Sequence, residues 1–239
     1  MRRLIIGSLA ALVIVGAGAF AIANSHRASD IGPRAASERP ALLLVTTLPI
    51  LFPEEFTLQG GGSKALEALE TRYTVLPIGT TDDRSLSQAR LLLMAHPLAQ
   101  PAENLVALDK WVRGGGRLLL LADPRLEWSS KRPLGDKLRP PPSFADTGLL
   151  AHWGLRLDAP EKAGPSQLEV AGREVLTASP GSLEGKCAIT EDRLVARCRI
   201  GRGRVTVIAD ADFLNVEQLG DGAQHNLDAV LAELAGLER

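Results

Sequence analysis

Residues 90–124 read RLLLMAHPLAQPAENLVALDKWVRGGGRLLLLADP, and this stretch decides the fold. Near each end it has an uncharged run rich in leucine, at residues 91–95 and 118–122. Such runs are typical of strands buried on both faces of a parallel sheet. Between these runs, residues 102–113 have the apolar spacing of a helix, and the glycines at 114–116 end it and lead into the next strand. The stretch is therefore predicted to form one strand–helix–strand unit of an α/β domain.

The same alternation continues on both sides of this unit. We expect further strands at residues 41–47, 73–78 and 204–209, and helices at residues 63–72 and 226–237. Together they predict an α/β fold with an open, doubly wound, mostly parallel sheet. Residues 125–143 are too rich in proline for a regular element and are expected to form a long surface loop. Short, weak strands predict a small β-rich insertion at about residues 153–200 of a domain that spans residues 41–239.

The composition excludes several classes of protein. The chain has 239 residues, of which 45% are apolar and 23% are charged, and its formal net charge is -1. This is the composition of a globular protein, and the near-zero charge predicts that no nucleic acid is a partner. Only 4% of the residues are aromatic, so the core must be aliphatic.

The N-terminus has the pattern of a targeting segment. Two arginines at positions 2 and 3 precede residues 4–23, an uncharged stretch of about 20 residues that is long enough to cross a bilayer. Residues 1–23 are expected to be a membrane anchor, or a signal segment that is cleaved after Ala21-Ile22-Ala23. Residues 24–40 are predicted to be a polar linker. By the positive-inside rule, the domain is expected in the periplasm, on a single-pass inner-membrane protein or secreted after cleavage.

Cys187 and Cys198 are the two cysteines of the chain. They flank a polar turn between short apolar stretches, which predicts a β-hairpin whose ends are close enough for a disulfide. In an oxidising compartment the two thiols are expected to pair; the alternative is two free buried thiols. Their spacing does not indicate a metal site.

Five polar residues lie at or just after the ends of predicted strands: Thr46, His96, Asp123, Asp210 and Asp212. Because the carboxyl ends of parallel strands open onto one crevice, we expect these side chains to line a cleft for a small ligand, a peptide or a partner protein. One histidine and three carboxylates also suit a divalent metal, but they come from separate loops without a fixed spacing. The other alternative is that the carboxylates accept backbone N–H groups at turns. No metal and no cofactor are expected.

The order of these motifs resembles one known family. Residues 92–97 (LLMAHP), 108–112 (LDKWV), 114–124 (GGGRLLLLADP), 201–214 (GRGRVTVIADADFL) and 226–228 (NLD) are similar to the GldG-type auxiliary component of ABC transport systems. The resemblance covers roughly residues 41–124 and 200–237. It implies a class I glutamine amidotransferase-like, or flavodoxin-like, domain. It also implies an ABC permease and ATPase, or another envelope protein, as partners. The chain departs from larger members of the family in being short, with one apolar segment.

The nucleophile of an amidotransferase-like enzyme is missing from the corresponding turn. Such enzymes place Cys or Ser between glycines in a strained turn, whereas this strand ends in Ala122-Asp123-Pro124. Ser129 and Ser130 lie on the loop beyond it, with no paired histidine and aspartate to activate them. We therefore expect a membrane-tethered, non-catalytic binding or interaction domain of a transport complex. The alternative is a periplasmic hydrolase with a carboxylate or metal-centred site at the strand ends.

Overall fold

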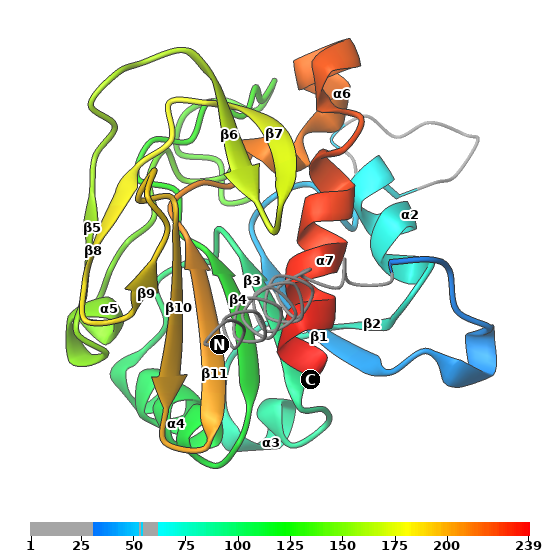
Figure 1. The fold of residues 1–239 in the computed structure, drawn as a ribbon, viewed down its shortest axis with the longest axis vertical. Helices are drawn as coiled ribbons and strands as arrows, with labels where there is room; N and C mark the ends of the chain where they lie inside the picture. Colours follow the sequence, from blue (N-terminus) through cyan, green and yellow to red (C-terminus); the bar gives the residue numbers. More distant parts are fainter. Residues whose placement is uncertain (1–30, 53, 55–61) are drawn as a thin grey trace, which may run out of the picture.

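The computed structural model describes residues 31–52, 54 and 62–239, and a seven-stranded sheet lies at its centre (Figure 1). Across the sheet the strands come in the order β2 (Thr74–Pro77), β1 (Ala41–Thr46), β3 (Leu91–Ala95), β4 (Arg117–Leu121), β11 (Gly203–Ile208), β10 (Val195–Ile200) and β9 (Ala188–Ile189). The first five are parallel, and β10 pairs antiparallel with both β11 and β9. The predicted α/β fold with a large, mostly parallel sheet is confirmed.

The two leucine runs form the centre of this sheet. All five residues of β3 are buried, and so are four of the five residues of β4. Both faces of these strands are therefore covered, as their uncharged sequence predicts. The glycines that follow α4 (Ala102–Arg113) are required by the turn, because Gly115 has a φ of 112° and a Cβ on Gly116 would lie 2.3 Å from the Trp111 ring.

The described residues form six helices and three 3₁₀ turns. They are α2 (Lys64–Glu70), α3 (Asp83–Leu86), α4, α5 (Leu149–His152), α6 (Val216–Leu219) and α7 (Asn226–Glu238), with 3₁₀ turns η1 (Ala36–Glu38), η2 (Asp212–Leu214) and η3 (Gly220–Ala223). Helix α7 packs on β4 and β11 and contacts α2, whereas α4 contacts β11 and packs with α3 (Figure 1). Leu69 of α2 and Leu231 of α7 line the same small internal space as Leu93 of β3, so these two helices close the core over one face of the sheet.

The predicted insertion is built differently from the expectation. Two separate two-stranded sheets, β5 (Leu155–Asp158) with β8 (Ser182–Gly185) and β6 (Pro165–Val170) with β7 (Arg173–Ala178), make up its first part. Strands β9 and β10, which also fall within residues 153–200, extend the central sheet instead. They do so because β10 and β11 form a hairpin with six paired residues on each strand.

The predicted membrane anchor requires a correction. A span needs about 20 apolar residues in one helix. In the described part of the chain, no helix is long and apolar enough to cross a membrane, and α7 has only 13 residues. This finding contradicts the predicted anchor and the predicted single-pass inner-membrane protein with its C-terminal domain in the periplasm. Residues 1–23, on which that prediction rested, lie outside the described residues.

Part of the predicted linker packs on the domain. The Arg34 guanidinium forms an ion pair with Glu238 of α7 at 2.8 Å, and the Arg72 guanidinium donates to the Gly32 carbonyl. Residues 36–38 form η1 immediately before β1. The linker from Gly32 onward is therefore held by ionic and hydrogen-bond contacts that its polar sequence did not indicate.

The predicted disulfide between Cys187 and Cys198 is confirmed. Pairing of Ala196 with Ile189 and of Arg197 with Ala188 brings the two cysteines opposite each other at the next position along the hairpin. Their Cα atoms are 4.9 Å apart, a separation at which a disulfide forms readily. The bond links the residue before the edge strand β9 to the neighbouring strand β10.

Candidate functional site

Three of the five predicted residues meet where β4 and β11 end. Leu121 pairs with Ile208, so Asp123 and Asp210, each two residues further on, lie next to each other. Asp212 begins η2, directly beyond Asp210. Asp123 and Asp210 are 0% exposed and Asp212 is 3% exposed. The structure thus brings three carboxyl groups together, but inside the protein and not in an open cleft.

Asp123 joins the turn after β4 to the turn after β11. One carboxylate oxygen accepts a hydrogen bond from the Arg125 N–H at 2.8 Å, and the other accepts one from the Ala211 N–H at 3.0 Å. Burial raises the pKa of Asp123 to about 6, although these N–H groups act in the opposite direction. Both oxygens are bonded to the backbone, so this carboxylate has the structural role that such groups take at turns.

Asp210 is the most deeply buried of the three carboxyl groups. Its Oδ1 accepts hydrogen bonds from the Thr177 hydroxyl at 2.6 Å and from the Phe213 N–H at 3.2 Å. Its Oδ2 is buried without a hydrogen-bond partner among the described residues. Burial, followed by the charge of Asp123, raises the pKa of Asp210 well above its usual value. The site therefore favours the protonated form of Asp210.

Asp212 connects the cluster to the loop after β4. Its Oδ2 accepts a hydrogen bond from the Glu127 N–H at 2.8 Å. Burial, followed by the charge of Asp123, raises the pKa of Asp212 to about 7. At neutral pH this carboxyl group is thus partly protonated, which is unusual for an aspartate.

Two polar side chains of the insertion complete the cluster, and sequence reasoning missed both. Thr177 and Ser179, in and just after β7, are 0% exposed. The Thr177 hydroxyl donates to Asp210, which is 33 positions away, and the Ser179 hydroxyl donates to Glu127, which is 52 positions away. No local pattern marks these residues, because only the folded chain brings them to the strand ends.

Thr46 and His96 lie at the ends of β1 and β3 and have separate partners. The Thr46 hydroxyl donates to the Ala95 carbonyl at 2.9 Å, and the Thr47 hydroxyl donates to the His96 carbonyl at 2.5 Å. His96 is 0% exposed, and its Nε2 lies 2.9 Å from the Pro141 carbonyl, so Nε2 carries the proton. Burial lowers the pKa of His96 because it disfavours the charged ring. His96 is thus a neutral ring that holds a loop.

A long loop, residues 122–148, covers this end of the sheet and is called the carboxyl-edge loop below. It contains no helix or strand, as its proline content predicts. The Phe144 N–H donates to the Asp123 carbonyl at 2.6 Å, and the Leu126 N–H donates to the Pro142 carbonyl at 3.0 Å. Together with the bond from His96 to Pro141, these contacts fold the loop back over the strand ends.

The two loop serines and His152 have partners within the protein, and the predicted metal alternative finds no suitable group of ligands among the described residues. The Ser130 hydroxyl donates to Glu54 at 2.5 Å, and the Ser129 N–H donates to Gln218 at 3.0 Å. His152 lies on α5 and pairs with Asp109 of α4 at 3.5 Å. Within residues 31–52, 54 and 62–239, no group of three His, Cys, Asp or Glu side chains is arranged to hold a metal ion.

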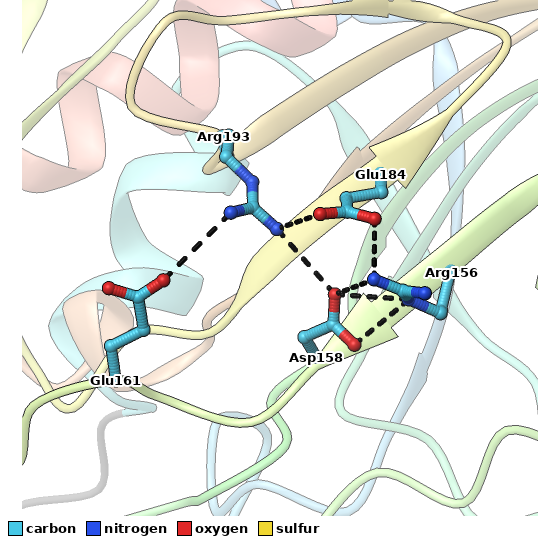
Figure 2. A network of polar contacts seen from close by, with 5 residues as sticks. All are labelled: Arg156, Asp158, Glu161, Glu184 and Arg193. Carbon is cyan, nitrogen blue, oxygen red and sulfur yellow. Dashed lines mark hydrogen bonds and ion pairs between the residues drawn. The ribbon is translucent and has the colours of Figure 1, made fainter.

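A second polar cluster lies on the insertion and has a structural role (Figure 2). Arg156 of β5 pairs with Asp158 at 3.0 Å and with Glu184 of β8. Arg193, in the turn before β10, pairs with Glu184 at 2.6 Å and reaches Glu161 at 3.9 Å. Figure 2 shows the two arginines on either side of the Glu184 carboxylate. These ion pairs tie β5 and β8 to the turn that leads into the central sheet.

Comparison with known proteins identifies a shared fold. No protein-family model and no curated protein matches the chain. The mmIFT52 N-terminal domain matches with a TM-score of 0.52 and 13% identity over 82% of this chain and 97% of that one. Cytoplasmic Protein STM3548 from Salmonella typhimurium matches with a TM-score of 0.51 and 10% identity, over 82% of this chain and 98% of that one.

An exo-β-1,4-mannosidase from an Opitutaceae bacterium is also similar, with a TM-score of 0.48 and 15% identity over 83% of this chain. The chain spans only 36% of the length of that glycosidase. At these identities the likeness is one of fold alone.

Proposed function

We propose that this chain is a non-catalytic binding and interaction domain that serves as an auxiliary component of an ABC-type transport assembly, of the GldG type. The observation that carries the proposal is the state of Asp123. The resemblance to amidotransferase-like domains implies that Asp123 lies where such enzymes carry the nucleophile. Both of its oxygens accept backbone N–H groups, from Arg125 and Ala211. An attacking group needs a free, exposed atom and donors aimed at the substrate. Asp123 instead joins two turns.

The order of the parallel strands supports the same proposal. We infer a doubly wound, flavodoxin-like sheet, because its parallel strands come in the order β2-β1-β3-β4-β11. In sheets with this order the chain connections change direction between the first and third strands. Ligands of these folds bind at that point. Here Thr46 and Thr47 bond to the carbonyls of Ala95 and His96 across it. These polar groups are thus used within the protein.

The alternative is a hydrolase that uses carboxyl groups at the strand ends. One observation favours it: the pKa of Asp123 is raised to about 6 and that of Asp212 to about 7, as in carboxyl groups that act as acids in catalysis. Burial argues against it, because Asp123 is 0% exposed and Asp212 is 3% exposed, so a substrate has no route to either group.

The test has an activity arm and a binding arm, both with the full chain. The chain is assayed against chromogenic esters, amides and glycosides, and with covalent probes for serine and cysteine. We expect no saturable turnover and no fold-dependent adduct on Ser129 or Ser130. Turnover that is lost in Asp212→Asn but kept in Asp221→Asn, an exposed control on η3, would establish the hydrolase instead.

For the binding arm, the genes beside that of this chain are searched for an ABC ATPase and permease, and the chain is co-expressed with them. We expect a complex that co-elutes in size-exclusion chromatography. The absence of such neighbouring genes, or separate elution of the chain, would contradict the transport assignment.

A further inference from the structure

A hollow of about 460 Å³ lies away from the carboxyl ends of the strands, beside the last turns of α7. Strands β10 and β11 form its floor, and α7 forms one wall. It is lined by Arg197, Cys198, Arg199, Arg204, Val205, Thr206, Glu233, Gly236 and Leu237. Three of these nine residues are arginines and one is a glutamate, in a chain whose formal net charge is -1. The hollow therefore concentrates positive charge.

One of the three arginines is already neutralised. Glu233 of α7 is 5% exposed, and its carboxylate binds the Arg197 guanidinium through both oxygens, at 3.3 Å from Nε to Oε2 and with Nη2 on Oε1. A two-pronged pair of this kind fixes the orientation of the arginine. It also ties the wall of the hollow to its floor.

The other two arginines of the hollow face each other across the β10–β11 hairpin. Arg199 of β10 is directly opposite Arg204 of β11 in the antiparallel register. Like charges at opposite positions of neighbouring strands repel and destabilise the sheet. Arg204 donates to the Gly236 carbonyl at 3.5 Å, but neither guanidinium forms an ion pair with a carboxylate in the part of the chain that the structure describes. Among the residues that the structure describes, no carboxylate pairs with either of these two neighbouring charges.

Protection of a sheet edge does not account for Arg204. Charged side chains on edge strands prevent unwanted pairing with other chains. Arg204, however, lies on β11, which is an interior strand between β4 and β10. Its charge cannot act on a free edge, so its placement opposite Arg199 needs a different explanation.

We propose that this hollow is a binding site for a small anionic ligand, whose oxyanion group, a carboxylate or a phosphate, is held between Arg199 and Arg204. Guanidinium groups bind both oxyanions through paired N–H donors. Thr206, which pairs with Arg197 in the same hairpin, supplies a hydroxyl beside them. The Cys187–Cys198 disulfide and the Arg197–Glu233 pair hold the floor and wall in place before the ligand arrives. Bound anion removes the repulsion between the two arginines.

Calorimetric titration of the full chain tests the site, with inorganic phosphate, glycerol phosphate and succinate as separate probes. We expect saturable one-to-one binding of at least one probe, and the preferred probe identifies the oxyanion. Arg199→Gln and Arg204→Gln should each weaken it by at least tenfold. Arg202→Gln is the matched control, because Arg202 lies in the turn between the same strands and binds the Gly114 carbonyl outside the hollow. This control should bind as tightly as the unaltered chain.

Arg199→Lys keeps the charge and the fold but removes the forked donor, so it separates recognition from folding. We expect it to weaken binding as well, with an unchanged circular dichroism spectrum. Three results would overturn the proposal: no saturable binding of any probe at millimolar concentration, equal loss in Arg202→Gln, or full affinity in both Arg199→Gln and Arg204→Gln.

Discussion

Replacing Asp212 by asparagine is expected to stabilise the protein at neutral pH. Burial and the charge of Asp123 raise the pKa of Asp212 from 3.8 to about 7. In the unfolded chain the group ionises near pH 4, whereas in the folded protein it keeps its proton up to about pH 7. The folded state thus binds more protons across this range, so the stability present below pH 4 is lost as the pH rises toward 7.

The size of the effect follows from the same pKa values. A change from 3.8 to about 7 corresponds to about 4 kcal/mol at most, and part of it belongs to the repulsion shared with Asp123. We expect Asp212→Asn to raise the free energy of unfolding by about 2–3 kcal/mol at pH 7. The asparagine oxygen can still accept the Glu127 N–H, which binds Asp212 at 2.8 Å, so no hydrogen bond of the turn is lost.

Urea unfolding followed by tryptophan fluorescence at pH 4 and pH 7 measures this difference. The unaltered protein should lose stability between the two values, and Asp212→Asn should lose less. Asp221→Asn, an exposed aspartate on η3, serves as the control and should follow the unaltered protein. A destabilised Asp212→Asn at pH 7, or a gain of equal size at both pH values, would refute burial as the cause of the raised pKa.

Three further outcomes are expected. The Cys187–Cys198 bond closes a loop with a sequence separation of 11, so its reduction should lower the free energy of unfolding by roughly 3 kcal/mol. Urea unfolding with and without reductant measures this change. Rapid alkylation of both thiols in the unreduced native protein would contradict it. Thr177→Val keeps the side-chain volume but removes the hydroxyl that binds Asp210, and should destabilise the protein by about 1–3 kcal/mol; an unchanged urea midpoint would show that the bond contributes nothing. Arg193→Gln removes exposed ion pairs to Glu184 and Glu161 and should shift the thermal midpoint of unfolding by less than about 3 °C, with a smaller shift in 1 M salt. A larger shift would mean that the ion pairs of Figure 2 stabilise the whole domain and not the insertion alone.

Local patterns were enough to predict the centre of the fold. The uncharged leucine runs of β3 and β4, with the helix and glycines between them, indicate a buried parallel pair whatever surrounds them, because only strands covered on both faces lack polar residues. The disulfide was also predictable from a local pattern, because Cys187 and Cys198 lie on one short hairpin. The sequence also placed Asp123, Asp210 and Asp212 at strand ends that share one edge.

Tertiary structure alone decided what those carboxyl groups do. Their burial depends on the carboxyl-edge loop and on Thr177 of the insertion, which reaches Asp210 across 33 positions. Whether β10 would join the central sheet, and so place Arg199 opposite Arg204, was likewise undecided by any local pattern. The physical reason is that strand period and chain turns are set by neighbouring residues, whereas burial and charge pairing depend on contacts between residues that are distant in the sequence.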